Sequence, residues 1–257
     1  MQVLPHTALS HIVRHYLVLE GAQPLGGTYR LFADGNTGLV FNLANDTLQH
    51  SSYLYGQVNT YYDLSLRGTI NLIVVVFRPY GAYHLWGVPA TEWSNCFFPA
   101  AGVLGPQIHD LSRALLKAEE VNDRIRLLDN FLLRQLDKNI QPDPVVVQAV
   151  QQITAHEGTL PVQSLLKTLS VNERTLERKF KSSTGISPKQ YSGIVRLNAS
   201  AKRIQRMKTA DRLTGIAYES GYFDQAHFIR DFRKYTGMSP HQLHYDVSAL
   251  ALNFLQL

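Results

Sequence analysis

Four charged side chains between positions 174 and 181 recur at the three- and four-residue spacing that puts residues on one helix face. They are Arg174, Glu177, Arg178 and Lys181. An arginine fork can donate two hydrogen bonds to guanine O6 and N7, and a glutamate can accept one from the amino group of cytosine. A salt bridge along the helix between Glu177 and Lys181 is an equally simple role for that pair. Arg178 has no such local partner, so it is the stronger candidate for an outward contact.

A second set of candidate side chains lies on a later stretch of helical pattern: Gln225, Ala226, His227, Ile229, Arg230 and Arg233. A glutamine can read adenine, and small apolar side chains can meet a thymine methyl group or face only backbone. His227, near the helix start, can donate to a phosphate or can remain solvated. Asp224 is placed to cap this helix, and Gly237 to end it in a left-handed conformation.

The two sets belong to an internal repeat. The segment 176–190, LERKFKSSTGISPKQ, aligns with 228–242, FIRDFRKYTGMSPHQ, at an offset of 52 residues with seven identities in fifteen positions. The expected caps, Asn172 and Asp224, share the offset. Chance does not explain this agreement, so the sequence contains a duplicated supersecondary unit.

Each copy is preceded by a short amphipathic helix and a tight turn. Residues 162–169 lead to Asn172, and residues 212–220 lead through Gly221 to Asp224. Helix, short turn and helix with a polar outer face is a helix-turn-helix, whose second helix enters the DNA major groove. Two generic helical hairpins are the alternative.

The region from about 145 to 245 resembles the DNA-binding domain of the AraC/XylS family of bacterial transcription regulators, and IAYESGYFDQAHFIRDFRKYTGMSP carries the resemblance most clearly. Tyr222 stands where phenylalanine is more usual, and Ala226 and Ile229 are apolar where polar readers often occur. The resemblance implies base contacts at two sets of positions: Arg174, Glu177, Arg178; Ala226, Ile229, Arg230. It also implies double-stranded DNA and RNA polymerase as partners.

Between the two units, residues 187–207 show helical spacing opened by Ser187-Pro188. A helix of about 20 residues spans about 30 Å, close to the separation of successive major grooves. Flanking cations would add affinity that does not depend on sequence: Lys181, Arg206, Lys208, Arg212, Arg233, Lys234.

Charge is distributed unevenly along the 257 residues. Residues 1–140 hold 10 Lys and Arg against 11 Asp and Glu, whereas residues 141–257 hold 15 against 9, so the net charges are −1 and +6. A basic C-terminal part favours an anionic partner, most often nucleic acid, although a solvated basic face has the same composition.

The first 140 residues read as β-rich at 11–20, 37–44, 51–58 and 68–79, and as helical after Gly105. The stretches LFADGNTGLVFNLA and FRPYGAYHLWGVPATEW resemble the cupin-like sensor half of some of these regulators, which binds an effector or dimerises. Candidate effector contacts are Phe41, Tyr55, Phe77, Arg78, Tyr80 and Trp86. Arg78 would suit an acidic effector or would otherwise form a surface salt bridge, and the aromatic residues would otherwise be core.

We therefore predict an α+β protein in two domains. Residues 1–140 form a cupin-like β-barrel or sandwich with two helices, and 141–257 form an all-α double helix-turn-helix domain, with a linker near 139–144. A stripe of Leu128, Leu132 and Leu136 predicts a homodimer through 108–138. The expected function is a sequence-specific, effector-modulated transcription regulator. The alternative is a cupin-type binding protein or enzyme whose helices no longer bind DNA specifically.

Other classes are disfavoured by what the sequence lacks. It has no apolar run near the 20 residues of a membrane span and no secretory signal pattern, so we expect a cytoplasmic protein. It has no H-x-H cluster, and His11 and His15 lie in a strand pattern, so we expect no metal, no cofactor and no enzymatic activity. Cys96, the one cysteine, is expected to be a buried structural thiol.

Overall fold

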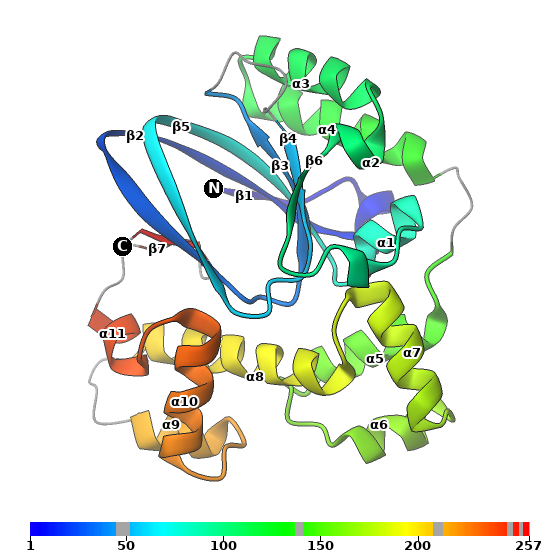
Figure 1. The fold of residues 1–257 in the computed structure, drawn as a ribbon, viewed down its shortest axis with the longest axis vertical. Helices are drawn as coiled ribbons and strands as arrows, with labels where there is room; N and C mark the ends of the chain where they lie inside the picture. The colour runs from blue at the N-terminus through cyan, green and yellow to red at the C-terminus, as the bar shows by residue number, and fades with distance from the viewer. Residues whose placement is uncertain (45–51, 137–140, 208–212, 246–248, 252–253, 257) are drawn as a thin grey trace.

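The computed structural model describes residues 1–44, 52–136, 141–207, 213–245, 249–251 and 254–256 (Figure 1). A curved sheet with flanking helices forms the N-terminal half, residues 1–136, and a layer of helices forms the C-terminal region, residues 141–245. This is the mixed α and β class that the sequence predicts. No helix in the described part of the chain is long and apolar enough to cross a membrane.

The sheet has the hydrogen-bonded order β6-β4-β3-β5-β2-β8-β7, and β1 pairs with β2. Its strands are β1 (Gln2–Val3), β2 (Val13–Phe32), β3 (Thr37–Asn42), β4 (Ser52–Tyr55), β5 (Tyr61–Phe77), β6 (Phe97–Pro99), β7 (Ala249–Ala251) and β8 (Phe254–Gln256). All pairings among the described strands are antiparallel. The long antiparallel pair of β2 and β5 bends over the rest of the sheet (Figure 1).

Alternation along β5 divides the buried side chains between two faces of the sheet. Ile73, Val75 and Phe77 join one apolar cluster, whereas the neighbouring Leu72 and Val74 join another. This is the two-residue period of a strand buried on both sides. The sheet therefore has one core beneath its helices and a second within its own curvature.

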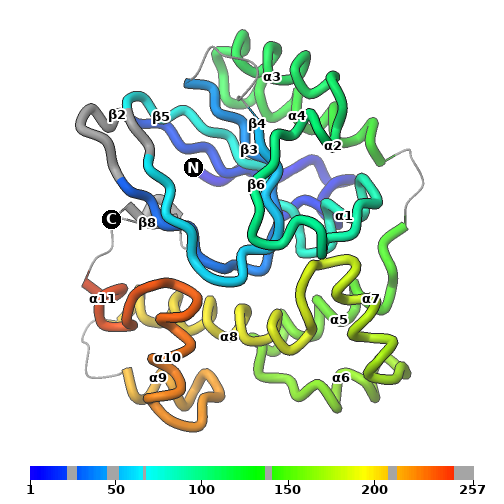
Figure 2. The backbone as a smooth tube through the Cα atoms, in the orientation of Figure 1, coloured from blue at the N-terminus to red at the C-terminus, as the bar shows by residue number. Residues whose placement is uncertain are grey.

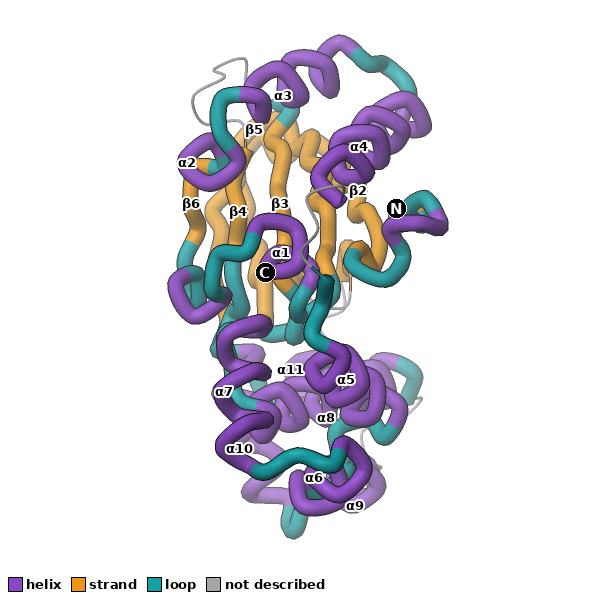
Figure 3. The backbone as a smooth tube through the Cα atoms, turned by 90° about the vertical axis from the view of Figure 1, so that its right-hand side faces the viewer, coloured by secondary structure: helices purple, strands orange, loops and turns teal. Residues whose placement is uncertain are grey.

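The helices of the N-terminal half are α1 (Gly81–Trp86), α2 (Ala101–Leu104), α3 (Gln107–Lys117) and α4 (Val121–Leu136), with 3-10 turns at Thr7–Leu9 and Ala90–Glu92. Figure 3 shows α3 and α4 over one face of the sheet. The leucine stripe is turned inward, because Leu128 and Leu132 are fully buried in the cluster that also contains Phe77. Only Leu136, at the helix end, is partly exposed. This stripe is core and supplies no dimer surface.

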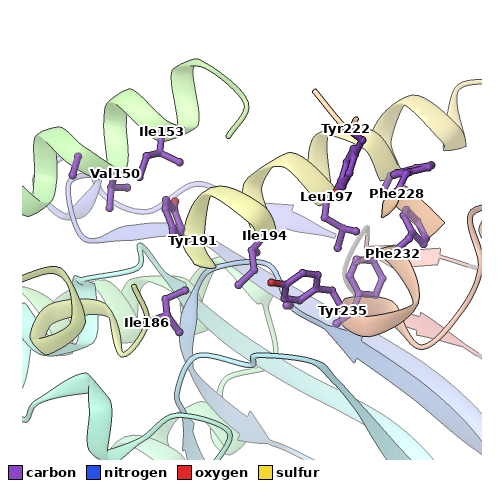
Figure 4. Packing of buried hydrophobic residues seen from close by; sticks show 14 of the residues in the cluster. Val150, Ile153, Ile186, Tyr191, Ile194, Leu197, Tyr222, Phe228, Phe232 and Tyr235 are labelled. Carbon is purple, nitrogen blue, oxygen red and sulfur yellow. The ribbon is translucent and has the colours of Figure 1, made fainter. Parts of the chain in front are cut away.

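The C-terminal region contains α5 (Pro144–Ala155), α6 (Val162–Leu169), α7 (Glu173–Thr184), α8 (Pro188–Gln205), α9 (Leu213–Glu219), α10 (Gln225–Thr236) and α11 (Pro240–Tyr245). Their core is centred on α8, from which Tyr191, Ile194 and Leu197 project among side chains of α5 and α10 (Figure 4). Each helix pair thus packs on α8 through an apolar face.

This core continues into the N-terminal half. Phe32, Ala33 and Tyr80 belong to the same buried cluster as the helices of the C-terminal region. Asn198 of α8 donates a hydrogen bond from its side-chain amide to the carbonyl oxygen of Ala33 at 2.9 Å. An added Cβ at Gly35 would lie 2.6 Å from the Tyr191 ring. The two parts are therefore packed against each other in the structure.

Several element boundaries differ from those that the sequence suggested. The strand expected at 68–79 begins earlier, as β5 at Tyr61, and the one expected at 51–58 is shorter, as β4 (Ser52–Tyr55). The strand expected at 11–20 continues as β2 to Phe32, and the chain end returns as β7 and β8, with β8 beside β2 (Figure 2). Residues 139 and 140 of the linker expected near 139–144, and with them the boundary at 140, lie outside the described residues, whereas Asp143 already caps α5, which begins at Pro144.

Candidate nucleic-acid interface

The first helix-turn-helix consists of α6, a tight turn and α7. Ser170 ends α6 with a left-handed backbone at φ 52°, and Asn172 caps α7 by accepting a hydrogen bond from the Thr175 backbone at 2.8 Å. Leu176 and Phe180 are fully buried on the inner side of α7. Capping and burial together fix which side of α7 faces outward.

The four predicted side chains of α7 all lie on that outward side. Arg174, Arg178 and Lys181 are exposed, and Glu177 is half-buried. Among the residues that the structure describes, none of these four side chains has a hydrogen bond or an ion pair, so the pairing of Glu177 with Lys181 is not formed. In contrast, Lys179 turns inward and contacts Asp143 at 2.7 Å. The outward cations of α7 are therefore available to an external acceptor.

The second helix-turn-helix consists of α9, a turn at Gly221 with φ 73°, and α10. Asp224 caps α10 by accepting from the His227 backbone at 2.6 Å. Phe228 and Phe232 are fully buried on the inner side of α10. The duplicated segments thus fold into equivalent units.

The six predicted side chains of α10 do not share one environment. Gln225, Ile229 and Arg233 line a hollow of about 290 Å³ beside the start of α11. Ala226 and Arg230 are exposed further round the helix. Arg230 therefore matches Arg178 of the first unit in position and in exposure.

His227 lies within a polar group instead of standing free. Its Nε2 is 3.5 Å from an oxygen of Asp231, one turn later, and its ring meets the Tyr222 ring edge-on at 5.2 Å. Arg196 of α8 stacks on Tyr222 at 4.3 Å and approaches Asp231 at 3.9 Å. Burial raises the pKa of Tyr222 to about 12, so its hydroxyl stays protonated. The i,i+4 spacing of His227 and Asp231 in the sequence indicates their contact, whereas no local spacing indicates that Arg196 joins them.

The helix between the two units has the expected start. Ser187 and Gln190 form a capping box, and the corresponding Ser239 and Gln242 exchange the same two hydrogen bonds at the start of α11. With 18 residues, α8 is about 27 Å long at 1.5 Å per residue. Of the flanking cations, Arg206 is exposed, and Lys208 and Arg212 lie outside the described residues.

The structure does not bring the six candidate effector contacts together. Phe41, Phe77 and Trp86 pack with the cluster beneath α3 and α4, Tyr55 packs within the sheet's curvature, and Tyr80 belongs to the core around α8. Arg78 donates to the carbonyl oxygen of Ser10 at 2.8 Å. Strand alternation separates Tyr55 from Phe41 and Phe77, whereas Tyr80 and Trp86 lie beyond the strands, at the two ends of α1.

A cavity of about 340 Å³ lies instead between the two parts of the protein. Side chains of both parts line it: Arg14, His15, Asp34, Tyr191, Asn198, Lys202. Burial and Arg14 lower the pKa of His15 to about 4. Burial lowers the pKa of Lys202, as do the charges of Arg14 and Arg206. Glu157 also lines the cavity, and its charge acts on the Lys202 pKa in the opposite direction, so the cavity holds cationic and acidic side chains together.

Two further candidates for chemistry are a metal-binding cluster and Cys96. Within the described ranges, no group of three or more His, Cys, Asp or Glu side chains is placed to hold a metal ion. Cys96 is exposed, so the prediction of a buried thiol is wrong. It precedes the edge strand β6, where strand alternation does not require burial.

Two capped reader helices, α7 and α10, held by one connecting helix, define a double helix-turn-helix protein. Residues 165–244 match the family model described as a helix-turn-helix domain, and residues 1–99 match one described as a domain of unknown function, DUF6597. The C-terminal region therefore contains a helix-turn-helix domain similar to those of AraC-type regulators, which confirms the resemblance read from the repeat.

Two curated relatives show the same relationship. The chain is 36% identical over 80 residues to the HTH-type transcriptional activator RhaS of Pectobacterium carotovorum, covering 31% of this chain and 28% of that protein. It is 26% identical over 180 residues to the arabinose operon regulatory protein of Escherichia coli, covering 65% and 61%. The matches thus span less than two thirds of either relative.

Two solved structures are similar. The C-terminal domain of AraT from Geobacillus stearothermophilus is 28% identical with a TM-score of 0.38, over 41% of this chain and 87% of that one. ToxT from Vibrio cholerae is 11% identical with a TM-score of 0.44, over 91% and 94%.

Proposed function

We propose that this protein is a sequence-specific DNA-binding transcription regulator. The observation that carries the proposal is the outward face of α7, where exposed cations beside Glu177 have no partner among the described residues. A second, equivalent helix follows on α10. The relatives that match the C-terminal region are named as transcription regulators.

Specific contacts are assigned by chemistry and position. Arg174, Arg178 and Arg230 suit guanine, Glu177 suits cytosine, and Gln225 suits adenine. Ala226 and Ile229 suit a thymine methyl group. Lys181 and Arg233 suit phosphates, and His227 suits a phosphate once its contact with Asp231 is exchanged. The protein acts by binding and not by catalysis.

A small-molecule effector is the second part of the proposal. The cavity between the two parts is of ligand size, and Arg14 and Lys202 suit an acidic molecule there. Thermal unfolding in the presence of a panel of organic acids tests this. Stabilisation that is lost in Lys202→Gln supports the cavity as the effector site, and equal stabilisation of both proteins contradicts it.

The remaining partners complete the proposal. The chain divides near residue 140 into a sensor or dimerisation domain and a DNA-binding domain, works in the cytoplasm and contacts RNA polymerase.

A homodimer through 108–138 would use the outer surface of α3 and α4, where Leu111, Ala114 and Leu127 line a hollow. Sedimentation showing only monomer at micromolar concentration, with and without DNA, would exclude the dimer.

The deciding experiment is a selection of DNA duplexes from a genomic or random-sequence library by the purified full chain. We expect saturable, sequence-selective binding whose affinity falls with salt. Arg174→Ala/Arg178→Ala is the test variant, and Lys179→Ala is the matched control because its charge turns inward. Binding that selects no sequence, or that the double variant retains unchanged, would contradict the proposal.

A further inference from the structure

The turns that end the two reader helices are built alike. The Thr184 and Thr236 hydroxyls each donate to the carbonyl oxygen four residues earlier, at 2.9 and 2.7 Å. Each turn then closes with a left-handed glycine, Gly185 at φ 83° and Gly237 at φ 70°. The repeat thus presents the same backbone feature twice, at the C-terminal end of α7 and of α10.

Both turns contact the N-terminal half, but through unrelated elements. Ser94 donates from Oγ to the Gly185 carbonyl oxygen at 3.2 Å, and Arg30 of β2 donates from Nη1 to the Gly237 carbonyl oxygen at 3.3 Å. The approach is close at each turn. An added Cβ would lie 2.7 Å from Ser94 Oγ at one and 2.7 Å from Arg30 Nη1 at the other. The positive φ favours glycine at both positions, and at Gly185 the Ala90 carbonyl oxygen, 2.8 Å from an added Cβ, also excludes a side chain.

The Arg30 side chain that contacts this turn is also fixed by neighbours within the N-terminal half. Two hydrogen bonds of 2.6 Å join its guanidinium to Asp63, and its charge lies 4.3 Å above the Tyr61 ring. Thr60 adds a second contact to the same helix end by donating to the Lys234 carbonyl oxygen at 2.8 Å. A cation and a hydroxyl at the carbonyl end of a helix are favourable partners of its dipole.

We propose that the N-terminal half positions the two reader helices relative to each other, with Arg30 as the positioning residue for α10. This inference rests on the proposed DNA-binding function. While both turns are docked, α10 has one orientation relative to α7, and the protein accepts one spacing of half-sites. When the Arg30 contact is lost, α10 keeps its fold on α8 but samples several orientations.

The test uses the full chain with two variants and one control. Arg30→Gln removes the guanidinium that contacts the Gly237 carbonyl oxygen, and Thr60→Val removes only the hydroxyl that contacts the Lys234 carbonyl oxygen. Arg113→Gln is the control, because Arg113 pairs with Asp110 on α3. The probes are the duplex that the wild-type chain selects from a random-sequence library, the same duplex with the second half-site scrambled, and versions with altered spacing.

We expect Arg30→Gln to weaken binding to the full duplex by about tenfold, since a mobile second reader adds less avidity. Binding to the scrambled duplex should not change, and the range of tolerated spacings should widen. Without DNA, backbone amides of residues 233–238 should exchange hydrogen faster. Thr60→Val should act in the same direction more weakly, and Arg113→Gln should match the wild type.

Three results would overturn the inference. One is wild-type spacing preference in both variants while thermal unfolding shows an intact fold. Another is equal weakening on the full and scrambled duplexes, which would indicate a general loss of fold. The third is unchanged hydrogen exchange at 233–238. If the wild-type chain selects no duplex, the proposed function fails instead, and hydrogen exchange still decides whether Arg30 positions α10.

Discussion

Neighbouring cations on α7 have different roles because the helix turns them to different sides. Arg178 is exposed and without a partner among the described residues, whereas Lys179 is turned toward Asp143. A helical step of about 100° per residue is enough for this difference. One position along the chain thus separates a candidate base contact from a structural ion pair.

Replacing Arg178 with alanine should weaken operator binding by about 1–3 kcal/mol and relax the preference at one base pair, because a bidentate contact to guanine would be lost. Competition binding against single-base variants of the selected duplex measures both effects. Lys179→Ala should leave base preference unchanged. Equal loss on every base variant would reassign Arg178 to a phosphate.

His84 should make the fold sensitive to mild acid. Burial and the nearby His11 lower the pKa of His84 from 6.5 to about 4, so between these values the unfolded chain takes up a proton that the folded chain does not. Stability is therefore complete above pH 6.5 and falls as the pH drops toward 4. From pH 7 to pH 5 this residue should account for about 1–2 kcal/mol. Denaturant unfolding of His84→Gln should show a shallower pH dependence, and exposed His241→Gln should not.

At the scale of elements, the leucine stripe of α4 packs in the core of its own chain, whereas the sequence pattern was interpreted as a dimer interface. An apolar stripe at helical spacing indicates a buried face, but it does not say whether another subunit or the same chain covers it. Here the sheet of the same chain covers Leu128 and Leu132. The partner of an apolar face is a tertiary property, which local spacing cannot report.

Leu132→Ala should consequently destabilise the fold by about 2–5 kcal/mol through the cavity that it leaves. The loss should appear in denaturant unfolding and should not depend on protein concentration, since the contact is internal. Leu136→Ala, at the partly exposed helix end, is the milder comparison. A midpoint that rises with protein concentration in the wild type and not in Leu132→Ala would return this stripe to a dimer interface.

The helical region was predictable from sequence in more detail than the sheet. Caps such as Asn172 and Asp224 and glycine stops such as Gly237 act within one turn of their own helix, so spacing alone located them. Strand β2 continues past residue 20 because its pairing with β5 is fixed by residues 29 to 49 positions away, from Phe32 with Tyr61 to Gly21 with Ile70. The ion pair of Arg30 with Asp63 joins two strands and left no local signal.

At the scale of the whole molecule, the N-terminal half is both a separate β structure and part of the support for the helices. Phe32, Ala33 and Tyr80 pack in the core around α8, and the cavity with Arg14 and Lys202 lies in the same boundary. A molecule bound there would contact α8, which joins the two reader helices. Effector binding and DNA binding are thereby expected to share one structural element.

The whole molecule should read two half-sites about one helical turn apart, and the first unit should carry most of the specificity. Arg174, Glu177 and Arg178 give the first unit three polar readers, whereas the second places Ala226 and Ile229 at two of its three matching positions. With 18 residues, α8 fixes the separation of the two helices.

Inserting about five base pairs between the half-sites should turn the second groove to the opposite side of the duplex and lose much of the affinity, by about tenfold or more. Inserting about ten base pairs returns the second groove to the original side of the duplex but increases the distance between the half-sites by about 34 Å. Because α8 cannot span that distance, the affinity should recover only in part. The same insertions outside the two half-sites serve as controls. Unchanged affinity after the shorter internal insertion would mean that the two units do not engage DNA together.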